Sequence, residues 1–217
     1  KEQPKLLIFC NPQNPIGHVW TYEELKAIGD LCVKYNVPVI SDEIHADLTL
    51  WDNKHIPMAS VSEEIRKNTI TCTSTGKAFN VAGLQCATIV FNNLEEKSKF
   101  DKFWKDLEVH RNNPFNLVAT IAAYTEGEEY LVQLKKYLED NIMFVYNYCK
   151  DNIPQIKPNI TQATYLVWVD CRQLCKDFGF RQADLEEFML KKAKLGLNPG
   201  RSFQKDLEGF MRINTAC

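Results

Sequence analysis

The chain has 217 residues, of which 45% are hydrophobic and 25% charged, and its formal net charge at pH 7 is −2. This is an ordinary globular composition, long enough for one large domain or two smaller ones. The charge balance gives no basic field that would attract nucleic acid. No apolar run approaches the roughly 18 residues that cross a membrane, and the apolar stretch after Lys5 is too short for a signal peptide. We expect a cytoplasmic protein with no nucleic-acid or membrane partner.

The eight cysteines are scattered, and none forms a C-x-x-C pair. In a chain of this length they indicate thiols in a reducing compartment, not a disulfide or zinc framework. Cys171 and Cys175 could meet on one helical turn, but no histidine is near them in the sequence. We therefore predict no metal site.

The first half alternates strands with helices. A capping box at Thr21 and Glu24 starts a helix, and a short helical piece is expected over 61–67. Four apolar runs are typical of strands, at residues 6–10, 37–40, 69–72 and 86–91. The first of these is continuous enough for a parallel strand buried on both faces. This alternation predicts an α/β fold with a mostly parallel sheet and flanking helices.

The second half changes character. The pattern predicts helices over residues 94–109, 116–124, 128–150 and 183–194, and strands over 165–169 and 210–214. We place a domain boundary near Glu126 and Gly127. The prediction is a partial large domain over residues 1–126 and a smaller C-terminal α+β domain over residues 127–217.

Three polar residues each come directly after a predicted strand: Asn14, Asp42 and Lys77. If those strands are parallel, their loops open on the same carboxyl edge of the sheet, where such sheets bind ligands.

Lys77 lies among small and hydroxyl-bearing residues, in the run Thr73-Ser74-Thr75-Gly76-Lys77. Small residues let a ligand approach the backbone, and hydroxyl groups of Ser74 and Thr75 can bond phosphate oxygens. A lysine amine shielded from water becomes a nucleophile towards carbonyls. We hypothesise that Lys77 holds pyridoxal 5'-phosphate (PLP) as a Schiff base. The alternatives are a solvated surface lysine, and hydroxyls that only end a strand.

PLP needs an anion at its ring nitrogen and a donor at its ring oxygen. Asp42 suits the first role, because a nearby carboxylate stabilises the protonated ring. Asn14 can donate an amide hydrogen to the ring oxygen, and His45 could approach the same atom. The alternatives are a helix cap for Asp42, a turn-forming role for Asn14 and a packed core histidine for His45.

Arg212 lies on the last predicted strand among apolar neighbours. It could bind a substrate carboxylate through two parallel hydrogen bonds, or it could pair with a structural acid.

Together these motifs resemble the fold-type I PLP enzymes, specifically the class I/II aminotransferase family. The matching segments are N-P-Q-N-P-I-G at 11–17, S-D-E-I-H-A-D-L at 41–48, S-T-G-K-A-F-N at 74–80 and F-M-R-I-N at 210–214. The resemblance is strongest to the cystathionine β-lyase, or C–S lyase, subgroup, since aminotransferases usually have tyrosine where His45 stands.

The chain departs from the family pattern in two ways. Gln85 stands where many aminotransferases have an arginine that binds the phosphate. The family pattern also begins before Lys1 and continues after Cys217, so we interpret the sequence as truncated at both ends. The missing part would include a phosphate-binding loop and an aromatic residue stacked on the ring.

The resemblance implies a homodimer that catalyses β-elimination from a sulfur amino acid, giving a thiol, pyruvate and ammonia. Cystathionine and cysteine conjugates are the implied substrates. A PLP-dependent aminotransferase shares every motif named here and is the alternative. A non-catalytic scaffold and a fragment without activity of its own also remain open.

Overall fold

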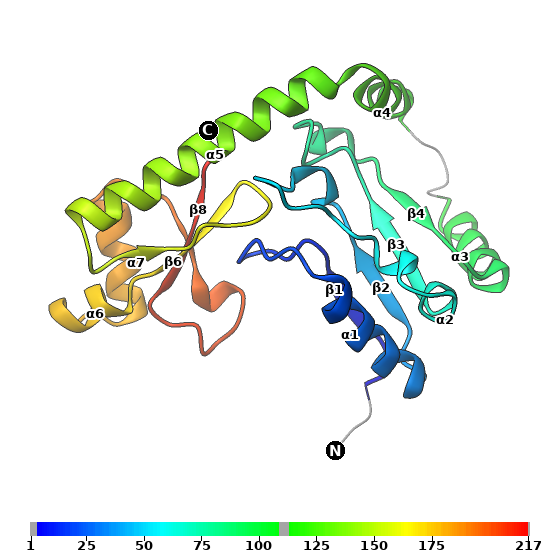
Figure 1. Cartoon of the computed structure of the whole chain (residues 1–217), viewed down its shortest axis with the longest axis horizontal. Coiled ribbons are helices and arrows are strands. Elements are labelled where there is room, and N and C mark those ends of the chain that lie inside the picture. The colour runs from blue at the N-terminus through cyan, green and yellow to red at the C-terminus, as the bar shows by residue number, and fades with distance from the viewer. Residues whose placement is uncertain (1–3, 109–112, 217) are drawn as a thin grey trace. The chain divides into compact units, whose positions relative to one another are not determined.

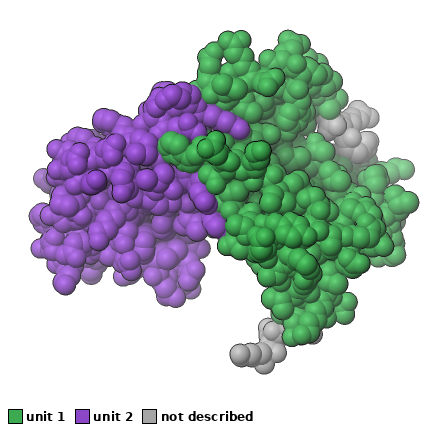
Figure 2. All heavy atoms as spheres, viewed as in Figure 1, with its two compact units in different colours: residues 1–13, 19–133 green, residues 14–18, 134–217 purple. Residues whose placement is uncertain are grey.

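The structure is a computed structural model that describes residues 4–108 and 113–216. It divides into two compact units, shown in different colours in Figure 2. The first comprises residues 1–13 and 19–133, and the second comprises residues 14–18 and 134–217. The division between the two units therefore falls inside the helix Glu128–Asn152, and the short segment 14–18 belongs to the second unit. The domain boundary after residue 126 stays a prediction.

The first unit contains a four-stranded sheet whose strands lie side by side in sequence order (Figure 1). Its strands are β1 (Leu7–Cys10), β2 (Val39–Asp42), β3 (Thr69–Thr73) and β4 (Thr88–Val90). β1, β2 and β3 pair in parallel, and β4 pairs with β3 in the antiparallel sense. The predicted mostly parallel α/β sheet is confirmed.

The helices of this unit follow the expected order. They are α1 (Tyr22–Lys34), α2 (Glu63–Lys67), α3 (Leu94–Asp106), α4 (Pro114–Glu126) and the start of α5 (Glu128–Asn152). Short 3₁₀ turns occur at Ala46–Leu48, Met58–Ser60 and Ala82–Leu84. The helix predicted over 94–109 ends at Asp106, and residue 109 lies outside the described residues.

Helices α1 and α2 pack against one face of the sheet through a buried apolar cluster. Its members are Phe9, Leu25, Cys32, Val37, Val39, Met58, Val61 and Ile65. The prediction that β1 is buried on both faces is wrong: Ile8, pointing to the opposite face from Phe9, is 72% exposed. The reason is that α1 and α2 pack against the face that carries Phe9, and Ile8 points to the other face.

The second unit contains an antiparallel sheet in the order β5-β6-β8-β7. Its strands are β5 (Lys157–Pro158), β6 (Leu166–Asp170), β8 (Phe210–Asn214) and β7 (Asn198–Pro199). The remaining part of α5 belongs to this unit, together with α6 (Arg172–Phe178), α7 (Gln182–Lys191) and a 3₁₀ turn at Gly200–Ser202. The sequence patterns found β6, β8 and α7 but missed α6 and the two-residue strands, which are too short to carry a period.

The seven cysteines in the described part of the chain form no disulfide. Burial raises the pKa of the Cys171 thiol to about 12, with smaller contributions from Cys175 and Asp170. Over the same residues, no helix is both long enough and apolar enough to cross a membrane.

The capping box of α1 provides a test of the fold. The Thr21 hydroxyl accepts a hydrogen bond from the Glu24 backbone N–H at 3.2 Å, and the Glu24 carboxylate accepts one from the Thr21 N–H at 2.8 Å. Thr21→Ala removes the first bond, so we expect urea unfolding to show a loss of about 1 kcal/mol. Exposed Glu23→Gln is the control, because Glu23 makes neither bond. Equal stability of the two variants would show that the cap does not contribute.

Candidate functional site

Strand β2 ends in a cluster of polar residues. Asp42 is its last residue and is partly buried, and His45, three residues on, is 3% exposed. One carboxylate oxygen of Asp42 accepts a hydrogen bond from the Ile44 backbone N–H at 3.2 Å. The Asp42 carbonyl accepts another from the Asn11 N–H at 2.9 Å, which joins the end of β2 to the end of β1. The backbone around the Asp42 carboxylate is therefore fixed.

Strand β3 ends in the hydroxyl-rich segment that leads to Lys77. Ser74 Oγ donates to the Cys86 carbonyl at 2.5 Å and accepts from the Gly76 N–H at 2.9 Å. Thr75 Oγ1 lies 3.5 Å from Thr120 Oγ1 on α4. Because the single hydroxyl hydrogen of Ser74 is used inside the protein, this hydroxyl would have to turn before it could donate to a phosphate.

Lys77 is partly buried, whereas the next residue, Ala78, is fully buried. No residue in the described part of the chain forms an ion pair or hydrogen bond with the Lys77 amine. Asp42 and Cys72 are register partners in the parallel pair β2–β3. The loops that carry Asp42 and Lys77 therefore leave the same edge of the first sheet, together with His45, Ser74 and Thr75.

The other two predicted residues, Asn14 and Arg212, meet in the second unit although 198 positions separate them. Arg212 Nη1 donates to Asn14 Oδ1 at 2.9 Å. Its Nη2 donates to Asn198 Oδ1 at 3.0 Å, and the guanidinium lies over the Phe203 ring at 4.8 Å. Two amide oxygens and an aromatic face thus fix the orientation of the guanidinium.

The charge of Arg212 is not neutralised locally. No described residue forms an ion pair with it, and Nε is buried without a hydrogen-bond partner. Burial lowers the pKa of Arg212, with the Tyr165 side chain acting weakly in the opposite direction. A partly buried cation with only neutral partners is suited to receive an anion. The structure therefore gives no support to the alternative in which Arg212 pairs with a structural acid.

The loop that carries Asn14 is anchored by Gly17. This residue has φ +68°, and a Cβ placed on it would lie 1.4 Å from Thr161 Oγ1. The Gly17 carbonyl accepts hydrogen bonds from the N–H groups of Gln162 and Ala163, both at 3.0 Å. Glycine is required here because any side chain would displace the 161–163 segment.

Sequence reasoning missed several residues that contact the predicted site residues or lie next to them in the chain or the fold. Asn198 and Phe203 orient Arg212, but they lie in the two-residue strand β7 and just after the 3₁₀ turn that follows it, both too short to carry a period. Tyr124 on α4 has its pKa raised by burial and by the negative charge of Asp47. The pairing of Glu43 with His55 was also missed, because only the chain fold brings these two residues together.

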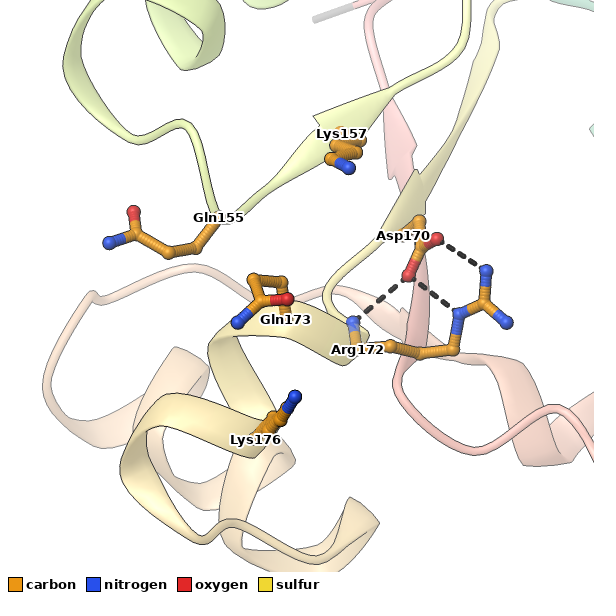
Figure 3. A pocket seen from close by; sticks show the side chains of 6 residues that line it. All are labelled: Gln155, Lys157, Asp170, Arg172, Gln173 and Lys176. Carbon is orange, nitrogen blue, oxygen red and sulfur yellow. Dashed lines mark hydrogen bonds and ion pairs between the residues drawn. The ribbon is translucent and has the colours of Figure 1, made fainter.

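A separate polar pocket of about 300 Å³ lies in the second unit (Figure 3). Asp170 forms an ion pair with Arg172 at 2.7 Å within it. The pocket is lined by Gln155, Lys157, Asp170, Arg172, Gln173 and Lys176. None of these is a predicted site residue, so the pocket is distinct from the candidate site.

Comparison with known proteins shows the family of this chain. The family model for aminotransferase class I and II matches residues 1–217. The chain belongs to this family.

Relatives of this chain include proteins named as lyases. Cystathionine beta-lyase PatB of Bacillus subtilis (strain 168) is 37% identical over 212 residues, which cover 98% of this chain and 54% of the relative. The crystal structure titled "PLP-bound putative aminotransferase from Clostridium difficile 630" superposes with a TM-score of 0.94 at 46% identity, covering 98% of this chain and 54% of the other. The PLP-bound C-S lyase from Staphylococcus hominis gives a TM-score of 0.88 at 36% identity, over 98% and 54%. The chain thus spans about half the length of the relatives it matches.

The position of Gly17 gives a second test. Gly17→Ala forces a side chain into a left-handed backbone and against Thr161, so we expect a loss of about 1–3 kcal/mol in urea unfolding. Gly196→Ala is the matched control in the same unit, since a Cβ there meets nothing within 4 Å. Equal losses in the two variants would contradict the packing described here.

Proposed function

We propose that the protein containing this chain is a PLP-dependent carbon–sulfur β-lyase that converts cystathionine or a cysteine conjugate to a thiol, pyruvate and ammonia. The observation that carries the proposal is the placement of Asp42 at the end of β2 and of Lys77 after the adjacent parallel strand β3, with no described residue acting as an acidic partner of Arg212. The lyase names of the relatives support the choice of reaction within the family.

The residues present fit PLP. The Lys77 amine has no partner in the described part of the chain that would compete for it, and Asp42 supplies a carboxylate at the same sheet edge. Asn14 gives its amide oxygen to Arg212, which leaves its amide hydrogens available for the ring oxygen. When bound, PLP supplies an electron sink for the pair of electrons released at the substrate α-carbon.

Lys77 has two roles in this proposal. Its amine would carry the cofactor covalently, and once released from the cofactor the same amine would remove the α-proton of the substrate. Asp42 keeps a proton on the ring nitrogen, because its carboxylate is stabilised by that positive charge and fixed by the Ile44 N–H. The His45 imidazole approaches the same ring oxygen as the Asn14 amide.

Arg212 binds the substrate α-carboxylate through its guanidinium, whose orientation is set by Asn14 and Asn198. Ser74 and Thr75 contribute to phosphate binding, Ser74 only after its hydroxyl turns away from the Cys86 carbonyl. We further propose a homodimer, as the resemblance implies. The scattered cysteines support a cytoplasmic location, and we propose no nucleic-acid or membrane partner.

The reaction is tested with the full-length protein and cystathionine. Formation of pyruvate and thiol in equal amounts is the expected result. Transfer of the amino group to a keto acid without pyruvate would instead identify an aminotransferase, which has the same set of motifs.

Lys77→Ala tests the covalent attachment. We expect the visible absorbance of the protein-bound cofactor to disappear and kcat to fall by about a thousandfold or more, because both the attachment and the base are lost. Exposed Lys54→Ala is the control and should keep both. Borohydride treatment followed by peptide mapping should label the peptide that contains Lys77 in the unsubstituted protein; a label elsewhere would remove Lys77 from this role.

Arg212→Lys tests the carboxylate site. Lysine keeps the charge but lacks the planar pair of donors, so we expect kcat/KM to fall about 10- to 100-fold, mainly through KM. Arg201→Lys is the control, since Arg201 is exposed and pairs with Glu186. An unchanged KM for the Arg212 variant would contradict the assignment.

A further inference from the structure

Glu43, the residue after Asp42, is a buried carboxylate with a complete set of partners. It is 3% exposed. Its Oε1 accepts hydrogen bonds from Ser41 Oγ at 2.8 Å and from the Met58 N–H at 3.0 Å. Its Oε2 lies 2.8 Å from His55 Nε2. Each of these three partners can donate, and an ionised carboxylate can only accept.

A neutral amide would fit this position less well than the carboxylate, because it could keep the bonds to Ser41 and Met58 only with His55 Nε2 as an acceptor. The imidazole proton would then lie on Nδ1, which is buried without a hydrogen-bond partner in the described part of the chain. Glutamine has one accepting oxygen, so its NH₂ group would face either His55 or the pair formed by Ser41 and Met58. Burying a charged group is unfavourable unless hydrogen bonds compensate for it. A carboxylate compensated on both oxygens therefore indicates that this position needs acceptors on both sides.

The contacts of Glu43 hold the chain on both sides of Asp42. Within β2, Ser41 bonds the Glu43 carboxylate, and the Glu43 backbone N–H donates to the Cys72 carbonyl of β3 at 2.8 Å. The carboxylate also holds the 55–58 segment through His55 and Met58. Asn11 holds that segment from the side of β1, since its Nδ2 donates to the Ile56 carbonyl at 2.9 Å.

His55 depends on this contact. Its Nδ1 is buried without a hydrogen-bond partner. Among the described residues, Glu43 is therefore the group that fixes the orientation of the imidazole ring. The imidazole bonds Oε2 of Glu43 while Ser41 and Met58 bond Oε1, so the carboxylate cannot rotate without breaking a hydrogen bond.

We propose that Glu43, held by His55, is a positioning residue that fixes the turn after β2 and so sets the direction of the Asp42 carboxylate towards the ring nitrogen of PLP. This inference rests on the proposed function, because it assigns Asp42 to that nitrogen. Glu43 does not touch the cofactor and acts through Asp42.

The test uses the full-length protein loaded with PLP that carries ¹⁵N in its ring. The ¹⁵N chemical shift reports whether the ring nitrogen is protonated, independently of turnover. We expect Glu43→Gln to move this signal towards the unprotonated position and to lower cofactor affinity about tenfold. Exposed Glu64→Gln is the control and should leave both unchanged.

Asp42→Asn separates the inference from the proposed function. If Asp42→Asn leaves the ¹⁵N signal unchanged, the assignment of Asp42 is wrong. If Asp42→Asn moves the signal and Glu43→Gln does not, only the positioning role is wrong. If each single variant moves the ¹⁵N signal, the double variant decides. The positioning role predicts that Asp42→Asn combined with Glu43→Gln gives the same signal as Asp42→Asn alone, because the two changes act on one interaction. An additive shift would contradict it.

A pair of His55 variants keeps the inference testable if Glu43→Gln does not fold. His55→Gln retains an N–H that can donate to Glu43, whereas His55→Leu has none. We expect the ¹⁵N signal to stay in place for His55→Gln and to move for His55→Leu. The same signal in both variants would overturn the inference.

Discussion

Parallel pairing of β1, β2 and β3 is the constraint on which the first unit depends. Each parallel strand must be followed by a crossover before the next one begins, so the loops at the carboxyl ends leave the same edge of the sheet. The apolar cluster between the sheet and α1 and α2 stabilises this arrangement. Asp42 and Lys77, from different crossover units, come to one edge as a consequence, without any direct bond between them.

The second unit organises its polar residues in a different way. Here the partly buried guanidinium of Arg212 on β8 contacts the loop at Asn14, Asn198 of β7 and Phe203, which follows the 3₁₀ turn after β7. Its partners are neutral, so they orient the positive charge without cancelling it. A structural acid at this place would have neutralised Arg212 and competed with the substrate carboxylate that we propose it binds.

The charged groups of the buried Glu43 and the partly buried Arg212 differ in how their hydrogen bonds are satisfied. The Glu43 carboxylate is compensated on both oxygens, and its contribution is to hold the backbone beside Asp42. Arg212 keeps a buried Nε without a partner. The first pattern is typical of a residue that supports a site, and the second of a residue that binds a ligand. The difference lies in hydrogen-bond satisfaction: the buried Glu43 carboxylate has partners on both oxygens, whereas the partly buried Arg212 keeps an Nε without one in the described part of the chain.

The sequence by itself determined the order and type of the long elements, the parallel sheet, the capping box at Thr21 and the segments that contain the candidate site residues. These follow from local periodicity and turn chemistry, which act over a few residues. Only the tertiary structure decided that β1 is exposed at Ile8, that Arg212 meets Asn14 and Asn198, and that Glu43 bonds His55 and Met58. Such contacts join residues far apart in the chain, and no local pattern records which distant partner satisfies a buried polar group.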